Sequence, residues 1–237
     1  LLTPKSLQPL MKVLGDLGNP KARRTVCEAV CEIGKGHVDQ IIPFMEDRRW
    51  YLVRNVIYIL GRVGKEQAIP SVQKGLAHRE MRVRREAVQA LGVIGGNKAF
   101  NLLTKALQDG DVRIRCTAAL NLGKVGRKSS LPYLIEFVQS KDFPRRDAAE
   151  KKAFFDAIGI AGSNDALPML QRLLLKRAWF RRRRVEELRQ GAASALALIA
   201  TREAKSVLEL GQKSKYASIR KACQQALRRR VPAEQRF

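Results

Sequence analysis

One short stretch decides the fold: residues 87–95 read AVQALGVIG. Related stretches are AVCEIG at 29–34, ILGRVG at 59–64 and ALNLGKVG at 119–126, with more divergent copies DAIGIAG at 156–162 and ALALIA at 195–200. Each copy closes on a small residue, at positions 34, 64, 95, 126, 162 and 200, so the spacings are 30, 31, 31, 36 and 38 residues. A recurring period of this length indicates an array of repeated structural units.

A period near 31 residues has room for two helices of about ten to fourteen residues and two turns. The first helix follows the small residue, as in 68–76 and 131–138, and carries a proline in its first turn, where a missing N–H costs nothing. The second helix has apolar residues every three or four positions, and Gly95 ends it with a residue free to adopt positive φ. No strand-like alternation competes, so the sequence predicts an all-α fold.

The repeat resembles the HEAT repeat family, particularly the short bacterial form found in bilin lyases. The residues that carry the resemblance are Asp109, Ile114-Arg115, Ala119-Leu120, Gly123, Val125-Gly126 and Leu131-Pro132. The resemblance covers nearly the whole chain in about seven repeats and implies an α-solenoid, a HEAT/armadillo-type superhelix with the second helices on its concave side. We expect residues 1–237 to form a single solenoid domain, and the start at Leu1 without Met suggests a fragment of a longer protein.

The chain is strongly basic, with 46 Lys and Arg against 22 Asp and Glu and a formal net charge of +24. Such a charge favours polyanionic neighbours: nucleic acid, an anionic membrane surface or acidic protein. The excess is uneven, because residues 1–47 hold six basic and six acidic residues and are neutral overall. A device for general solubility would spread along the whole array, so we expect the excess to serve a local purpose.

Basic residues gather in the turn between the two helices of a repeat and in the first turn of the second helix. We predict that they form a polyanion-binding stripe along one edge of the concave side. Its candidate members are Arg48, Arg49, Arg54, Arg79, Arg82, Arg84, Arg85, Arg113, Arg115, Arg145, Arg146, Arg181, Arg182, Arg183 and Arg184. Free N–H groups at a helix start, together with arginine, make an anion site.

Some of this charge has an internal explanation. The family resemblance implies a ladder in which an Asp of the turn pairs with an Arg of a neighbouring repeat, so Asp47 and Asp109 are expected to pair with Arg84, Arg115 or Arg54. His78 replaces the Asp in the third repeat. The remaining arginines, namely Arg48, Arg49, Arg79, Arg82 and Arg113, exceed any such ladder, and form either a plain solvated face or a site for an anionic partner.

The two long repeats carry their extra residues between the first and second helices, at 140–147 and 176–185. Insertions of this kind often mark the binding face of a repeat array. Trp179-Phe180 lies among arginines in the second insertion, and Trp50-Tyr51 lies among arginines in an earlier turn. These aromatic residues are predicted contacts that stack bases or anchor an acidic peptide, or else they cap the core beneath arginine side chains.

Catalytic motifs are absent from the sequence. There is no HExxH, no phosphate-binding glycine loop and no nucleophile elbow. Neither His37 nor His78 is followed by Glu, so the His-Glu pairs of iron-binding HEAT-repeat hydroxylases are missing. HEAT-like DNA glycosylases need an acidic residue among tryptophans, for which Asp147, Glu150 or Asp156 have no particular claim. We expect no enzyme activity, no cofactor and no metal site.

Cys27 and Cys31 lie one helical turn apart in an apolar stripe, which is typical of reduced core cysteines in a cytoplasmic protein. No run of apolar residues is long enough for a transmembrane helix, and no signal peptide is recognisable.

The preferred hypothesis is therefore a non-catalytic scaffold whose basic edge holds an acidic protein segment. Nucleic-acid binding through the stripe and the Trp179-Phe180-Arg181 loop is the alternative. Anionic lipid, a nucleotide, or a role as an enzyme accessory such as a bilin-lyase-like subunit are weaker ones.

Overall fold

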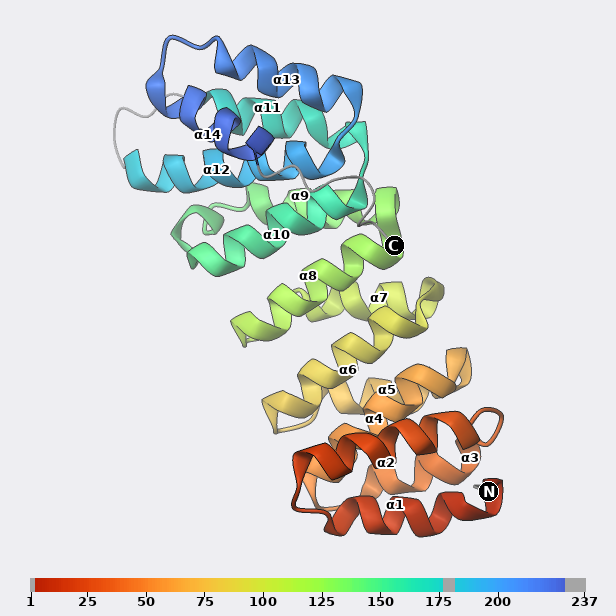
Figure 1. The fold of residues 1–237 in the computed structure, drawn as a ribbon. Coiled ribbons are helices and arrows are strands. Elements are labelled where there is room, and N and C mark those ends of the chain that lie inside the picture. The colour runs from red at the N-terminus through yellow and green to blue at the C-terminus, as the bar shows by residue number, and fades with distance from the viewer. Residues whose placement is uncertain (1–2, 177–181, 229–237) are drawn as a thin grey trace. The chain divides into compact units, whose positions relative to one another are not determined.

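The computed structural model describes residues 3–176 and 182–228, and within these ranges every regular element is helical. The helices form hairpins in chain order (Figure 1). The pairs are α1 (Leu7–Asp16) with α2 (Pro20–Ile33), α3 (Val38–Ile41) with α4 (Trp50–Val63), α5 (Ile69–Leu76) with α6 (Met81–Ile94), α7 (Gly96–Ala106) with α8 (Val112–Gly126), α9 (Leu131–Gln139) with α10 (Ala148–Ala161), α11 (Leu167–Leu175) with α12 (Arg182–Ile199), and α13 (Arg202–Gln212) with α14 (Ala217–Arg228). The predicted α-solenoid class is confirmed.

The predicted helix ends are confirmed. The second helices of the first six hairpins stop at or directly before the small residues at 34, 64, 95, 126, 162 and 200. Gly95 and Gly162 adopt φ of +69° and +68°, which glycine tolerates without steric cost. Ala200 adopts φ of +55° at the same point of its repeat. The prolines Pro70, Pro132 and Pro168 each occupy the first turn of a first helix, as expected.

The repeat motif contains a second glycine, at Gly61, Gly92 and Gly123, which allows close packing between helices rather than ending a helix. A Cβ atom on Gly61 would lie 2.7 Å from Cβ of Ala90, and one on Gly92 would lie 2.1 Å from Oδ1 of Asn121. A Cβ on Gly123 would lie 2.5 Å from the carbonyl oxygen of Ala157. Each glycine therefore lets two successive second helices approach closely, so the motif encodes stacking between repeats as well as the end of a helix.

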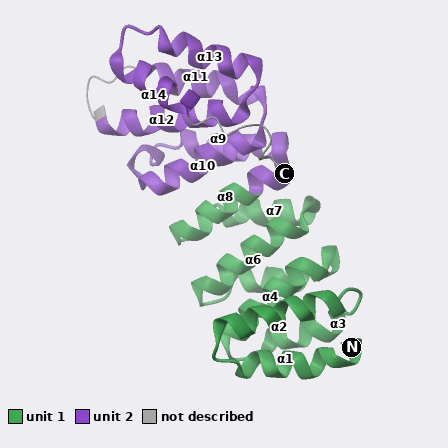
Figure 2. Cartoon of the chain, viewed as in Figure 1, with its two compact units in different colours: residues 1–121 green, residues 122–237 purple. Residues whose placement is uncertain are grey.

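The chain divides into two compact units, Leu1–Asn121 and Leu122–Phe237, with the boundary inside α8 (Figure 2). In unit 1, α2 packs on α4 and α4 packs on α6, and the core contains Leu52, Ile57, Leu60 and Leu91. In unit 2, α10 packs on α12 and α12 packs on α14. Each unit thus stacks its second helices in one layer and buries its own apolar core.

The inserted segment at 140–147 lies between α9 and α10, as predicted, and takes part in the core of unit 2. Phe143 is fully buried and makes an edge-on ring contact with Phe154, at a centroid distance of 5.9 Å. Phe137 stacks on Phe154 at 4.0 Å. The insertion is anchored by this aromatic cluster, which accounts for the phenylalanine in its sequence.

Cys27 and Cys31 are buried and free, as the sequence predicts, and Cys223 is buried and free as well. Burial raises the pKa of the Cys27 thiol to about 12 and that of the Cys31 thiol to about 11, because the apolar surroundings disfavour a thiolate. Both side chains act as small apolar groups in the core. None of the helices that the structure describes is long and apolar enough to span a membrane.

Candidate functional site

The same type of hydrogen bond recurs in the turns before α4, α6 and α8: a side chain accepts from the backbone N–H two residues later. The backbone N–H of Arg49 donates to Oδ1 of Asp47 at 2.8 Å, and the N–H of Asp111 donates to Oδ1 of Asp109 at 2.8 Å. In the turn between them, the N–H of Glu80 donates to Nδ1 of His78 at 2.9 Å. His78 therefore does take the place of the aspartate, because its ring nitrogen accepts the same bond two residues on.

A second recurring feature is an arginine in the first turns of the second helix that binds the carbonyls of its own turn. Nη1 of Arg84 donates to the carbonyls of His78 and Arg79, at 3.1 and 3.4 Å. Nη1 of Arg115 donates to those of Asp109 and Gly110, at 2.8 and 3.0 Å. Arg220 in unit 2 does the same with Ser214 and Lys215, at 2.8 and 2.9 Å. We call Arg84, Arg115 and Arg220 the clamp arginines.

One step of the expected ladder is present in unit 1. Arg84 and Asp109 make an ion pair of 3.1 Å between consecutive repeats, and both side chains are largely buried, at 21% and 16% exposure. Asp47 does not pair with Arg84, Arg115 or Arg54. It pairs instead with Arg49 at 2.9 Å, because the turn folds that side chain back over the aspartate two residues earlier. Arg49 also binds Asp16 of the preceding turn at 2.8 Å.

Three arginines expected to exceed the ladder have carboxylate neighbours, which corrects that expectation. Arg49 binds Asp47 and Asp16. Arg113 binds Asp111 at 2.7 Å, which lowers the pKa of Asp111 to about 2. Arg82 lies 3.8 Å from Glu80. Asp47, Glu80 and Asp111 each lie two residues before their arginine, where the bend into the helix brings the two side chains together.

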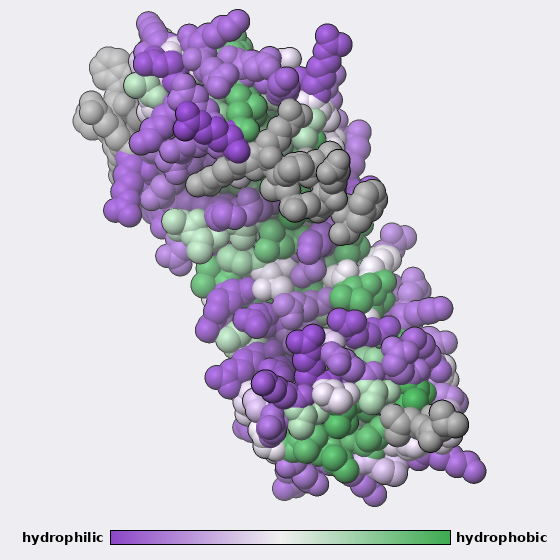
Figure 3. All heavy atoms as spheres, in the orientation of Figure 1, coloured by the Kyte–Doolittle hydropathy of each residue, from purple (hydrophilic) through white to green (hydrophobic). Residues whose placement is uncertain are grey.

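A smaller group of arginines in unit 1 makes no ion pair in the described chain. We call Arg48, Arg54, Arg79 and Arg85 the open arginines, because within the part of the chain that the structure describes no carboxylate lies within ion-pair distance of them. Arg48, Arg79 and Arg85 are exposed, and Arg54 is half-buried. Arg48 and Arg79 precede successive second helices at the same point of their repeats, and so do Arg54 and Arg85 inside those helices. Figure 3 shows hydrophilic residues over the beginning of α6, the helix that carries Arg85.

The aromatic residues Trp50 and Tyr51, at the start of α4, are half-buried rather than exposed to solvent. The rings of Trp50 and Tyr51 meet edge-on at 6.0 Å. The guanidinium of Arg82 lies 5.0 Å from the centre of the Trp50 ring, and that of Arg23 lies 5.9 Å from the Tyr51 ring. Arginines from neighbouring repeats therefore cover these rings, which matches the prediction of a capped core.

Unit 2 treats its basic residues differently. Arg146 binds Glu150 at 3.1 Å and lies 4.8 Å above the Phe137 ring, and Arg145 lies 3.6 Å from Asp142. Lys151, almost fully buried, binds Glu187 at 2.6 Å. Lys151 lowers the pKa of that carboxyl. Arg183 reaches the same carboxylate at 3.3 Å while remaining exposed.

Arg189 is the residue that sequence reasoning missed. Its side chain is only 5% exposed, and it donates to the carbonyls of Leu174 and Lys176 at 3.1 and 2.8 Å. It also binds Glu186 at 2.5 Å and Ser218 at 3.1 Å. Its position in the repeat could have identified it. Counting back from the small residue that ends each second helix places Arg189 at the same repeat position as Arg84 and Arg115.

Several predicted contacts lie outside the described residues, namely Trp179, Phe180, Arg181 and the side chain of Arg182. Arg184 is described, and it is half-exposed near the start of α12.

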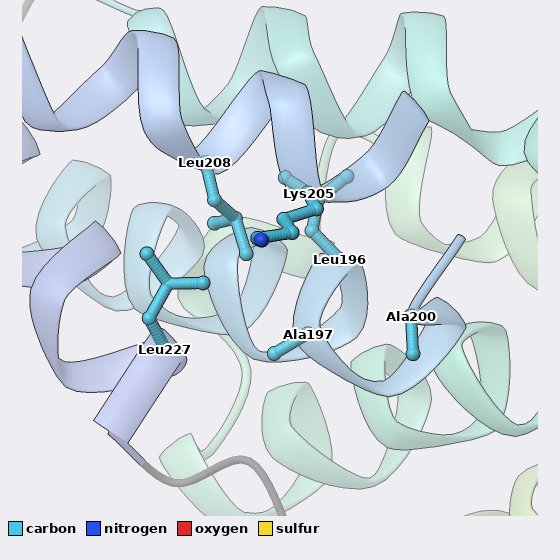
Figure 4. A pocket seen from close by; sticks show the side chains of 6 residues that line it. All are labelled: Leu196, Ala197, Ala200, Lys205, Leu208 and Leu227. Atoms are coloured by element: carbon cyan, nitrogen blue, oxygen red, sulfur yellow. The ribbon is translucent and has the colours of Figure 1, made fainter. Parts of the chain in front are cut away.

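The described residues contain no group of three or more His, Cys, Asp or Glu side chains arranged to hold a metal ion. One small hollow lies in the last repeats of unit 2 (Figure 4). Leucines and alanines of α12, α13 and α14 line it, with the ammonium of Lys205 as its polar group. Lys205 also lies 3.4 Å from Glu209.

Stacked hairpins, glycine contacts between second helices and a side-chain-bonded turn define a helical repeat protein of the α-solenoid class. The chain belongs to the HEAT-repeat family, which matches residues 7–92 and 72–153. Among solved structures, the complex of CpcE and CpcF of phycocyanin lyase from Nostoc sp. PCC7120 is similar, with 21% identity and a TM-score of 0.53 over 78% of this chain and 74% of that chain. At this identity the likeness concerns the fold alone.

Two further solved structures are more distant. Human deoxyhypusine hydroxylase in complex with glycerol has 18% identity and a TM-score of 0.43, covering 95% of this chain and 96% of that chain. An engineered protein has 18% identity and a TM-score of 0.47, covering 81% of this chain and 95% of that chain. No curated protein matches the chain.

Proposed function

We propose that the protein is a HEAT-repeat binding scaffold and that the open arginines of unit 1 hold an acidic segment of a protein partner. One observation carries the proposal. Arg84 and Arg115 are engaged by their own turns, whereas Arg48, Arg79 and Arg85 project into solvent with no carboxylate at ion-pair distance in the described chain. Like charges at equivalent points of successive repeats repel one another, and an acidic ligand relieves that repulsion.

An acidic protein segment fits this edge better than single-stranded nucleic acid. Bases need an open aromatic face on which to stack, and the described rings Trp50 and Tyr51 are half-buried with guanidinium groups over them. Carboxylates need only the guanidinium donors, which bind them with two parallel hydrogen bonds. Nucleic acid is therefore the competing outcome of the test. The predicted contacts Arg181 to Arg184 and Trp179-Phe180 stay part of the proposal as a second contact region.

The test is a titration by fluorescence anisotropy. A labelled acidic peptide and labelled single- and double-stranded oligonucleotides are each mixed with the protein at increasing salt. We expect the peptide to bind at low salt and to weaken as salt screens the exposed charges. Tight oligonucleotide binding that falls by about 10³ between roughly 50 and 200 mM salt would instead identify a nucleic-acid protein. Binding of neither ligand at low salt contradicts both readings.

Matched double variants locate the site. Replacing Arg79 and Arg85 with Gln removes two charges from the edge, and replacing Lys98 and Lys105 with Gln removes two exposed charges from α7. We expect the arginine pair to lower peptide affinity by about tenfold or more, which corresponds to about 1.4 kcal/mol. The lysine pair is expected to change affinity about twofold at most, since exposed charges at a distance are screened. Equal effects would refute the assignment of the edge.

A further inference from the structure

A buried amide in unit 1 lacks a hydrogen-bond partner. Asn55 of α4 is only 4% exposed, and its Nδ2 has no acceptor among the described residues. Nη2 of Arg54 donates to Oδ1 of Asn55 at 3.1 Å. Because the guanidinium only donates, this contact fixes Oδ1 on the Arg54 side and leaves Nδ2 as the orphan donor. Buried donors without acceptors are rare in folded proteins, so this one calls for a function.

An acceptor occupies the same point of the next repeat. Glu86 of α6 is level with Asn55 of α4, one repeat later, and is half-buried. Burial raises the pKa of the Glu86 carboxyl, although the nearby charges of Arg54 and Arg85 oppose that rise. No carboxylate–arginine contact within ion-pair distance involves Glu86 in the described chain. An orphan donor and a half-buried carboxylate that makes no ion pair in the described chain thus lie on successive second helices, each beside an open arginine.

Arg54 is positioned to uncover the amide. Neighbouring residues of a helix point about 100° apart, so Arg54 must fold back along α4 to reach the amide of Asn55. A carboxylate is a stronger partner for a guanidinium than a neutral amide oxygen. An acidic ligand that draws the Arg54 guanidinium outward therefore frees Oδ1 of Asn55, beside the Nδ2 that already lacks a partner.

We infer that Asn55 and Glu86 bind the main chain of the acidic segment, with Asn55 Nδ2 donating to a peptide carbonyl and Glu86 accepting from a peptide N–H. The inference rests on the proposed function and names the partner as a peptide in extended conformation. A peptide offers acceptors and donors in alternation along its length. A phosphate backbone offers acceptors only, so it has no N–H for the Glu86 carboxylate to accept.

The experiment compares two probes of equal charge. One is a labelled peptide in which Glu and Gly alternate, and the other has sarcosine in place of each Gly, which removes those N–H groups but keeps every carboxylate. Affinities are measured for the wild type, for Asn55→Leu, and for the exposed control Gln73→Leu on α5. Thermal unfolding of each variant is followed in parallel.

We expect the wild type and Gln73→Leu to bind the Glu-Gly peptide about tenfold more tightly than the sarcosine peptide. Asn55→Leu is expected to lose about tenfold in affinity for the Glu-Gly peptide with only a small change in Tm, because it removes an orphan donor together with a single acceptor bond, the one from Nη2 of Arg54. Asn55→Asp, which keeps an oxygen for Arg54, is expected to weaken binding as well.

Two results overturn the inference while the proposed function stands: equal affinity for both probes in the wild type, or a large drop in Tm for Asn55→Leu and Asn55→Asp with no selective loss of binding. Failure of the wild type to bind either probe at low salt overturns the inference and the proposed function together.

Discussion

Units 1 and 2 hold comparable basic sequences and use them differently. Unit 2 buries two of its cations, Lys151 and Arg189, and each has a carboxylate partner and a fixed place in the packing, while others such as Arg172 and Lys213 stay exposed. Unit 1 engages Arg84 internally but leaves Arg48, Arg79 and Arg85 exposed without ion pairs in the described chain. A basic sequence therefore does not by itself indicate a binding surface. What matters is how much of the charge the fold has already compensated.

The largest expected effect on the free energy of unfolding concerns the buried Arg189 of unit 2. Arg189→Met removes four hydrogen-bonding contacts and leaves Glu186 and two carbonyls without their cation. We expect a loss of about 3–5 kcal/mol in the free energy of unfolding, as for other broken buried ion pairs, measured by urea denaturation. Arg183→Met is the control, because the Arg183 side chain is 93% exposed and its pair with Glu187 contributes little. Similar losses from both variants would show that burial does not separate the two roles.

The next effect concerns the clamp of unit 1. Arg84→Met removes the pair with Asp109 and two bonds to turn carbonyls, so the free energy of unfolding should fall by about 2 kcal/mol. Arg85→Met, one residue later on the exposed side of α6, should change it by less than about 0.5 kcal/mol. If Arg85→Met proves as costly as Arg84→Met, the division of unit 1 into clamp and open arginines is wrong.

A smaller effect depends on pH. Lys151 holds the pKa of Glu187 below its usual value, so the pair contributes stability above the unfolded pKa of about 4.3 and loses it as pH falls through the folded pKa. We expect Lys151→Met to be about 1 kcal/mol less stable than the wild type at neutral pH. The difference should shrink below about pH 4, as followed by denaturation at several pH values. A constant difference across this range contradicts the ion-pair explanation.

The smallest effect on stability belongs to the open arginines themselves. Arg48→Gln and Arg79→Gln should leave the free energy of unfolding within about 0.5 kcal/mol of the wild type, or raise it slightly by relieving repulsion. The same substitutions are expected to weaken binding of the acidic peptide. Loss of stability of more than about 1 kcal/mol would show that these residues have structural partners and would remove the contrast with unit 2.

The fold was predictable from the sequence because it depends on periodic features. The small residues at the helix ends, the prolines in the first turns and the positions of the insertions all follow from spacing alone. The role of each arginine did not follow. Whether Arg113 is open depends on a bend that returns its guanidinium to Asp111, and whether Arg84 is engaged depends on carbonyls five and six residues earlier. These contacts are set by turn conformation, which charge counting does not describe.

The glycine contacts between second helices have a consequence for how each unit unfolds. Gly61 meets Ala90, and Gly92 meets Asn121, so every such joint couples one hairpin only to its immediate successor. Cooperativity in such a stack is a chain of nearest-neighbour terms rather than one global event. Amide hydrogen exchange should therefore be graded within a unit, with terminal hairpins opening at lower free energy than internal ones. Replacing one of these glycines with a larger residue would weaken one contact between hairpins. The stability measured by amide exchange should then differ between the hairpins before and after that contact.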